Sequence, residues 1–262
     1  MNMTIYLPSI HTNGTPPVEP AVTYGPVGFG VGCPWQNAEA DNTWYQRVLD
    51  LLQPPWWYDW QFHQIGRDGY VPMLWAMRRD GYYAEAMSKA RAYPRTFWLM
   101  GNEPEAPEQS ATDPSEAAET MRRWMYDTGV RFAAPGVILN NRGFAWLDDY
   151  LAFGGPVPMA WHVHNYAQTV EAWSLWLDEF NHWMYDNKVL RPVIVSETAI
   201  DKQDMNEQVP LLAVIGNALS AHKVQAVAWF SAEYASHSWT NLTEGDELTS
   251  LGKHFVEMNR NH

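Results

Sequence analysis

The order of apolar segments in this chain restricts it to very few folds. From about residue 27 onward, short apolar runs alternate with longer stretches of helical periodicity. Runs that are apolar almost throughout are typical of parallel strands buried on both faces. The eight expected strands cover residues 27–32, 56–60, 70–77, 96–101, 131–138, 159–166, 192–198 and 224–231.

The stretches between these runs carry helix signals. Expected helices cover residues 113–129, 169–188, 209–223 and 248–260. The first has Asp113 in the N-cap position, Pro114 in its first turn and Gly129 at its end. Eight strands, each followed by a helix, give roughly 29 residues per unit, as in a (β/α)8 barrel of typically ~250 residues.

We therefore expect an α/β protein with a single (β/α)8 TIM barrel. Residues 27–262 would form the barrel, and residues 1–26 would be an irregular N-terminal lead-in segment. The main alternative is a doubly wound open sheet. No Gly-rich phosphate loop follows any expected strand, so the usual purpose of that fold is missing.

Composition excludes several kinds of partner. The net charge of −13 argues against nucleic acid and against anionic membranes, because both attract basic patches. No stretch reaches the ~20 apolar residues that a membrane span needs. The first residues lack a basic start and a long apolar core, so we do not expect a signal peptide in this chain.

Cysteine and aromatic content restrict the kinds of site that this chain can form. The single cysteine, Cys33, excludes an internal disulfide and a cysteine-built zinc site. Fifteen tryptophans and thirteen tyrosines exceed what packing alone usually requires. Flat rings suit ligands that have apolar faces and polar edges, as sugars do, although many of these rings would belong to the core.

Two glutamates end buried strands. The run Phe97-Trp98-Leu99-Met100 stops at Gly101 and is followed by Asn102 and Glu103, and the seventh expected strand ends in Ser196-Glu197. In a (β/α)8 barrel the active site lies at the carboxyl ends of the strands. Strands four and seven lie on opposite sides of the barrel mouth, so the two carboxyl groups can face each other. Two glutamates that merely cap the following helices would be the alternative.

A pair of carboxyl groups ~5–5.5 Å apart suits retaining glycoside hydrolysis, with one as acid/base and one as nucleophile. Burial and neighbouring charge would raise the pKa of one of them. Asn102 would offer its amide to a sugar hydroxyl.

These residues resemble a known group. "GNEP" on strand four and "SE" on strand seven are similar to the retaining (β/α)8 glycoside hydrolases of clan A. "WWYDW", "WLMGNEPE" and "HVHNY" further resemble glycoside hydrolase family 128, whose substrate class is β-1,3-glucan. The resemblance implies that Glu103 is the acid/base, that Glu197 is the nucleophile and that Asn102 contacts the hydroxyl beside the anomeric carbon. No cofactor is implied.

Further sugar contacts are expected from three strands. Strand alternation sends Trp56, Tyr58 and Trp60 to one face and Trp57 and Asp59 to the other. The candidates for substrate binding, besides Asn102, are Tyr58 and Trp60 from the aromatic block. The resemblance further implies that His162, His164 and Tyr166 line the sugar site, with a buried structural histidine as the alternative for His162, and that Trp229 is the floor under the cleaved sugar. Trp75 is a further candidate, and Glu233 and Tyr234 would either reach the cleft or lie in a solvated loop.

The sequence leaves other functions open. His162 and His164 point the same way along their strand and could bind a metal, but the first strand lacks the histidines of metal-dependent barrel hydrolases, so we expect no metal. A clan A enzyme for β-1,4-glucan, mannan, galactan or xylan, or a binding barrel without turnover, would share most of these features. We expect a monomeric endo-β-1,3-glucanase whose partner is a polysaccharide or oligosaccharide; the polysaccharide suggests an extracellular enzyme, although the compartment is open.

Overall fold

The structure is a computed structural model that describes residues 25–34 and 43–261. The expected lead-in segment, residues 1–26, therefore lies almost wholly outside the described residues. The side chain of Asn261 is also not described.

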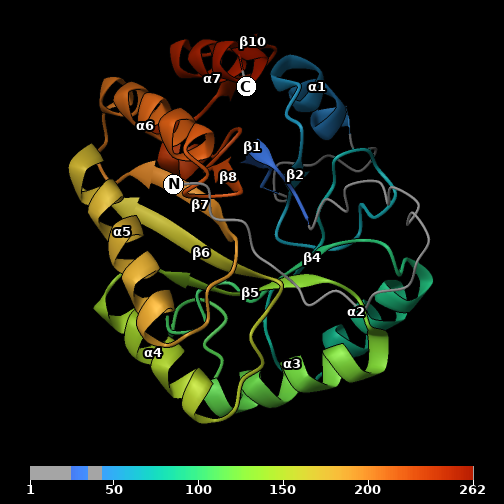
Figure 1. Ribbon diagram of the computed structural model, residues 1–262. Helices are drawn as coiled ribbons and strands as arrows, with labels where there is room; N and C mark the ends of the chain where they lie inside the picture. The colour runs from blue at the N-terminus through green and yellow to red at the C-terminus, as the bar shows by residue number, and fades with distance from the viewer. Residues whose placement is uncertain (1–24, 35–42, 262) are drawn as a thin grey trace, which may run out of the picture.

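Eight parallel strands form one sheet that curves into a nearly closed barrel (Figure 1). They are β1 (Gly28–Gly32), β2 (Trp57–Tyr58), β3 (Met73–Leu74), β4 (Trp98–Met100), β5 (Phe132–Ile138), β6 (Ala160–Ala167), β7 (Val193–Ile200) and β8 (Ala226–Trp229). Their order is β2-β1-β8-β7-β6-β5-β4-β3, and a parallel bridge between Trp57 and Tyr70 joins the two ends. The expected (β/α)8 barrel is confirmed.

Helices surround the barrel on the outside (Figure 1). They are α1 (Thr43–Leu52), α2 (Gly81–Ala92), α3 (Pro114–Thr128), α4 (Asn141–Ala152), α5 (Val170–Asp186), α6 (Val209–Ser220) and α7 (Ser250–Asn261). Shorter elements are the 3₁₀ turns Met205–Glu207 and Ala235–Thr240, and an antiparallel ribbon of β9 (Thr243–Glu244) and β10 (Glu247–Leu248).

Helix α3 begins and ends where its sequence signals predict. The Asp113 side chain accepts a hydrogen bond from the Ser115 backbone N–H at 2.8 Å, and Pro114 occupies the first turn. Gly129 closes the helix with φ 64°, a left-handed conformation that glycine adopts without steric cost. Ala117, Met121 and other residues on the same face are buried toward the barrel.

The expectation that a helix follows every strand is wrong for β2. Residues 59–72 fold as turns rather than a helix, and β2 and β3 each contain only two residues, although longer strands were expected over 56–60 and 70–77. Gly66 and Gly69 turn the chain with φ 103° and 67°. Pro72 has no N–H to give to a ladder. This seam, the β2–β3 connection, brings Trp60 to the mouth of the barrel, and Trp75 reaches it directly after β3.

Two packed layers follow from strand alternation. Outward-facing side chains such as Trp161 and Val163 of β6 join the helices in the larger core. Inside the barrel, Trp56 and Tyr58 pack against small residues, among them Ala133 and Ala160. Small side chains on the other strands therefore leave room for the rings that the β2 segment sends inward.

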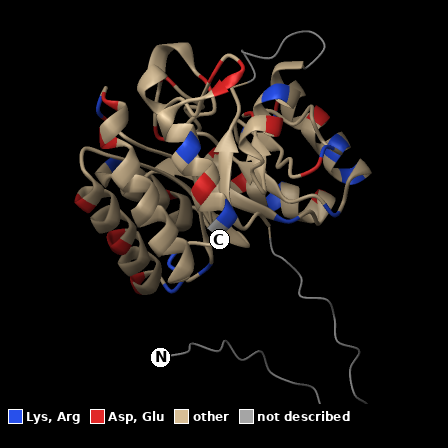
Figure 2. Ribbon diagram, turned by 90° about the horizontal axis from the view of Figure 1, so that it is seen from above, with Lys and Arg blue, Asp and Glu red and all other residues tan. Residues whose placement is uncertain are grey.

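Charged residues lie mostly on the outer helices and loops (Figure 2). Helix α3 carries Glu119 in contact with Arg122 and Arg123, an exposed group of ion pairs. None of the helices in residues 25–34 and 43–261 combines the length and the apolar character that a bilayer crossing requires.

Candidate active site

The carboxyl end of β4 places Glu103 at the barrel mouth. Gly101 leaves the strand with φ 83°, and Glu103 itself has φ 47°, a conformation that non-glycine residues adopt at a cost of roughly 1–3 kcal/mol. The Glu103 N–H donates to the Gly136 carbonyl at 2.9 Å, and the Ala106 N–H donates back to the Glu103 carbonyl at 2.9 Å. The backbone that carries this carboxyl group is thus held from both sides.

The carboxyl end of β7 places Glu197 opposite. Two buried side chains contact Ser196, the preceding residue. The Tyr58 hydroxyl donates to the Ser196 carbonyl at 2.8 Å, and His162 Nε2 contacts the Ser196 hydroxyl. Burial, followed by the charge of His164, lowers the pKa of His162 well below its usual range, so this ring is neutral. Tyr58 and His162 are both fully buried and support the strand that carries Glu197.

His164 joins the two glutamates. Its Nδ1 lies 2.9 Å from Glu103 Oε1, and its Nε2 lies 3.3 Å from Glu197 Oε1. Burial lowers the pKa of His164, but the charge of Glu197 and the hydrogen bond and charge of Glu103 outweigh it and raise the pKa. A protonated imidazole between two carboxyl groups compensates their mutual repulsion.

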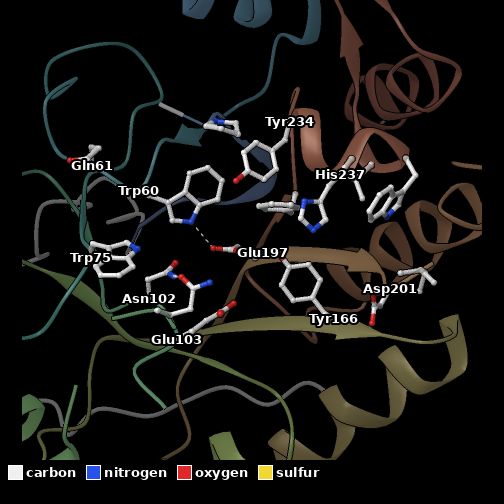
Figure 3. Close-up of a pocket in the computed structure, with 16 residues that line it drawn as sticks. Trp60, Gln61, Trp75, Asn102, Glu103, Tyr166, Glu197, Asp201, Tyr234 and His237 are labelled. Carbon is white, nitrogen blue, oxygen red and sulfur yellow. Dashed lines mark hydrogen bonds between the residues drawn. The ribbon is translucent and has the colours of Figure 1, made fainter. Parts of the chain in front are cut away.

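Glu197 has two further donors. The Trp60 indole N–H donates to Oε1 at 2.6 Å, and the Tyr166 hydroxyl donates to Oε2 at 2.7 Å (Figure 3). Burial raises the pKa of Glu197, and nearby Glu103 raises it too, whereas His164, Tyr166 and Trp60 lower it; the net direction is upward. The donors therefore offset part of the cost of burying this carboxylate.

A cavity of about 660 Å³ opens over both glutamates. Seven of its lining residues carry aromatic rings: Trp60, Trp75, Tyr166, Phe230, Tyr234, His237 and Trp239. Asn102, Gln109 and Asp201 add polar groups, and the Asn102 amide N–H donates to Gln109 Oε1 at 3.2 Å. Figure 3 shows the labelled side chains arranged around the Glu103–Glu197 pair. Rings around polar groups suit a sugar chain.

Glu103, His164 and Glu197 also offer three potential metal ligands within 4.8 Å of one another. The raised pKa of His164 opposes this use, because a protonated imidazole has no lone pair to give. A metal ion would have to displace that proton. His162, the other member of the His162–His164 pair considered from sequence, is not part of this group, and its Nε2 contacts the Ser196 hydroxyl.

The model of the family described as glycosyl hydrolase catalytic core matches residues 32–255. The chain belongs to this family. The match spans most of the barrel, including both strands that carry the glutamates, and it makes the chain a glycoside hydrolase. A search of the curated proteins found no match to the sequence.

Solved structures share the fold of this glycosyl hydrolase. A GH128 (subgroup I) endo-β-1,3-glucanase from Amycolatopsis mediterranei, in complex with laminaritriose, is 22% identical with a TM-score of 0.70, covering 89% of this chain and 100% of its own. A GH128 (subgroup III) curdlan-specific exo-β-1,3-glucanase from Blastomyces gilchristii, in complex with glucose, is also 22% identical with a TM-score of 0.70, covering 87% and 97%. The subgroup II endo-β-1,3-glucanase from Sorangium cellulosum is 22% identical with a TM-score of 0.66, covering 88% and 98%.

The structure brings most of the candidate residues of this glycosyl hydrolase together. Glu103, Glu197, Asn102, Trp60 and Tyr166 line the cavity, as do the further candidates Trp75 and Tyr234. His164 lies between the glutamates. Tyr58 and His162, expected to bind substrate, instead lie beneath Glu197 and do not line the cavity, because both point into the closed barrel interior.

The structure corrects the role expected for Trp229. It was expected as the floor under the sugar, but its side chain is fully buried on the outer face of β8, where its indole N–H donates to the Thr240 carbonyl at 2.8 Å. Alternation explains the error, because Ala226 and Ala228 face the barrel interior and Val227 and Trp229 face the helices. Phe230, the next residue, is the aromatic side chain that lines the cavity.

Several lining residues were not singled out from sequence. Phe230 lies within the expected strand 224–231, Asp201 lies three residues beyond the expected strand 192–198, and Gln109 comes seven residues after Asn102. The segment Tyr234-Ala-Ser-His-Ser-Trp239 is dense in rings and directly follows a strand end, which is the signal that would have found His237 and Trp239. Gln61 follows the aromatic block of β2 and carries no such signal.

Proposed function

We propose that this glycoside hydrolase is a retaining endo-β-1,3-glucanase that uses Glu197 as nucleophile and Glu103 as acid/base. The observation that carries the mechanism is the proximity of the two carboxyl groups: an oxygen of each lies within 4.8 Å of the other and of His164. Retaining enzymes hold their carboxyl groups ~5–5.5 Å apart, whereas inverting enzymes need ~6.5–9.5 Å to admit a water molecule.

In the first step Glu197 attacks the anomeric carbon and Glu103 gives its proton to the departing glycosidic oxygen. In the second step Glu103 takes a proton from water, and the water releases the sugar from Glu197. The indole of Trp60 and the hydroxyl of Tyr166 hold Glu197 in place for this attack. Asn102, whose Oδ1 is buried without a hydrogen-bond partner, can accept one from a sugar hydroxyl.

The substrate class rests on the family and on the likeness to the β-1,3-glucanases. The ring-lined cavity of about 660 Å³ has room for several sugar units, which supports an oligosaccharide or polysaccharide as the partner. Monomeric state stays a prediction.

The test is product analysis by mass spectrometry. Wild type and Glu197→Gln would be incubated with laminarin, carboxymethyl-cellulose, mannan and xylan, each with and without a chelator. We expect short oligosaccharides from laminarin with wild type alone, with no effect of the chelator. Cleavage of another glycan would overturn the substrate, and loss of activity with the chelator would favour a metal in the Glu103–His164–Glu197 group.

A second experiment separates the two glutamates. Glu103→Gln should lose activity on laminarin but keep it on an aryl β-glucoside oligomer with a good leaving group, because such a group departs without a proton. Proton NMR of the first product should give the β-anomer. Initial α-anomer, or equal loss on both substrates, would contradict these roles.

A further inference from the structure

Asp59 is a buried acid on the outer face of the barrel sheet, away from the cavity. It is 1% exposed and lies among the outward-facing residues of the β2 segment, beneath helix α1. The Tyr45 hydroxyl donates to its Oδ2 at 2.7 Å, and the Tyr70 hydroxyl donates to its Oδ1 at 2.6 Å. A carboxyl group so far from solvent needs a reason to be there, since burial of an acid is costly.

The contacts of Asp59 extend to the backbone around Trp60. The Gln61 N–H donates to Asp59 Oδ1 at 3.1 Å, and the single Tyr70 hydroxyl proton is shared between Asp59 Oδ1 and the Gln61 carbonyl oxygen, each of which lies 2.6 Å from the hydroxyl oxygen. The Met73 N–H donates to the same carbonyl at 2.7 Å. Both neighbours of Trp60 are thereby fixed, and the group Tyr45, Asp59, Gln61 and Tyr70 is called here the Asp59 clamp.

Trp60 adopts a backbone conformation that needs such support. Its φ is 61°, in the left-handed region that a bulky residue adopts only when the surroundings enforce it. This turn directs the indole into the cavity, where Nε1 reaches Glu197 Oε1 at 2.6 Å (Figure 3). Gly32 leaves room for the ring, because a Cβ there would meet the Trp60 Cη2 at 2.8 Å.

We propose that Asp59 and Tyr70 are positioning residues that act through the clamp to hold Trp60 in its left-handed turn, so that its indole N–H stays on the Glu197 carboxylate. The inference rests on the proposed role of Glu197 as nucleophile. The chain of contacts crosses the sheet, from Tyr45 and Tyr70 through Asp59 and Gln61 to Trp60 and then Glu197. Asp59 itself touches no part of the cavity, so its effect on the reaction passes through Trp60.

If the clamp is weakened, the acid limb of the pH–activity profile should shift. A donor on a carboxylate favours its ionised form, so a weaker Trp60 contact makes Glu197 harder to ionise. The groups that face Glu197 are Glu103 from β4, His164 and Tyr166 from β6, and Tyr58 and Trp60 from the β2 segment. The groups that face Asp59 are Tyr45, Tyr70, His63, Cys33 and Tyr82, and Arg67 lies over the ring of Tyr45.

The test is a mutant cycle read in the pH profile of kcat/KM on laminarin. Trp60→Phe removes the N–H donor but keeps a ring, and should move the acid limb up by about one pH unit. Tyr70→Phe removes one hydroxyl of the clamp and should move it in the same direction, by roughly half as much. Tyr166→Phe provides the matched control, because it removes a donor to Glu197 that does not depend on the clamp.

The cycle distinguishes positioning from ordinary stabilisation. Tyr70→Phe should still shift the acid limb in the Tyr166→Phe background but should add no shift in the Trp60→Phe background. Its effect on melting temperature should be alike in both. A Tyr70→Phe variant that lowers the melting temperature and leaves the acid limb in place, or shifts it equally in both backgrounds, would overturn the proposal.

An NMR titration makes the test independent of turnover. The indole ¹H–¹⁵N resonance of Trp60, assigned by its loss in Trp60→Phe, should follow the ionisation of Glu197 in wild type and lose this response in Glu197→Gln. In Tyr70→Phe its midpoint should move upward. Wild type without activity on laminarin would refute the proposed function, whereas a Trp60 resonance insensitive to Glu197 would refute the clamp.

Discussion

A shift of one residue decides which aromatic ring of β8 meets the substrate. Trp229 and Phe230 are neighbours in sequence, yet they face different parts of the molecule. Trp229 packs in the outer core, with its ring centroid 6.4 Å from that of Phe29, while Phe230 lines the cavity beside Trp60. The two side chains therefore have different consequences when removed. Removal of the Trp229 ring should lower stability, and removal of the Phe230 ring should lower activity.

Trp229→Ala should destabilise the fold by about 3–5 kcal/mol, because it empties a buried site and leaves the Thr240 carbonyl without its donor. Urea unfolding measures this loss. Phe230→Ala is the matched control and should lower kcat/KM on laminarin with a smaller cost in stability. The opposite pattern, a stable Trp229→Ala with impaired turnover, would return Trp229 to the sugar site.

The strand-end glutamates could be predicted because an apolar run that stops at a carboxyl group identifies the barrel rim from the sequence alone. The faces of Tyr58, His162 and Trp229 could not be predicted as reliably. Each follows from where alternation starts within its strand, and from how deep the residue lies below the rim. Those two quantities depend on register between strands, and neighbouring strands are far apart in sequence.

At the scale of elements, the junction of β4 and β5 supports Glu103. Gly101 has φ 83°, and a Cβ at that position would lie 2.3 Å from the Pro135 carbonyl oxygen. Gly136 approaches from the other side, where a Cβ would lie 2.3 Å from the Gly101 carbonyl oxygen. The two strands can therefore come this close only because both positions lack side chains.

Gly101→Ala should destabilise the protein by about 2–4 kcal/mol, since it adds both left-handed strain and a clash with backbone. It should also lower activity by displacing Glu103. Gly81→Ala is the control: a Cβ at this first residue of α2 meets nothing within 4 Å, so the change should be stabilising by roughly 0.5–1 kcal/mol. Calorimetric melting of the two variants gives the comparison, and equal melting temperatures would contradict it.

The elements themselves were largely evident from the sequence. All eight strands were expected near their observed positions, and the capping residues of α3 marked both of its ends. The β2–β3 connection was not foreseen, because Trp, Tyr and Val in residues 56–60 and 70–77 favour strands while the seam of the barrel gives them few partners. Its turns are what place Trp60 beside Glu197.

For the whole molecule, ionisation links the active site to stability. Burial raises the pKa of Glu197, Asp59 and Glu105 from the ordinary value of each carboxyl group. A folded state that keeps protons the unfolded chain has lost becomes less stable as pH rises through the folded pKa. His164 acts in the same direction above pH 6.5, its ordinary value, because its pKa is also raised. His162, whose pKa is lowered, opposes this only below pH 6.5, where the unfolded chain takes up a proton.

The free energy of unfolding should therefore fall between pH 6.5 and pH 8.5, because His162 no longer contributes there and the unfolded chain has lost a proton that His164 binds more tightly in the folded state. The net charge of −13 adds repulsion in the same direction. Urea unfolding at the two pH values measures the slope. Glu197→Gln should flatten it, because glutamine does not titrate and no longer raises the pKa of His164. A stability that rises across this window, or a slope unchanged in Glu197→Gln, would mean that the Glu103–His164–Glu197 group does not share its proton in the folded state.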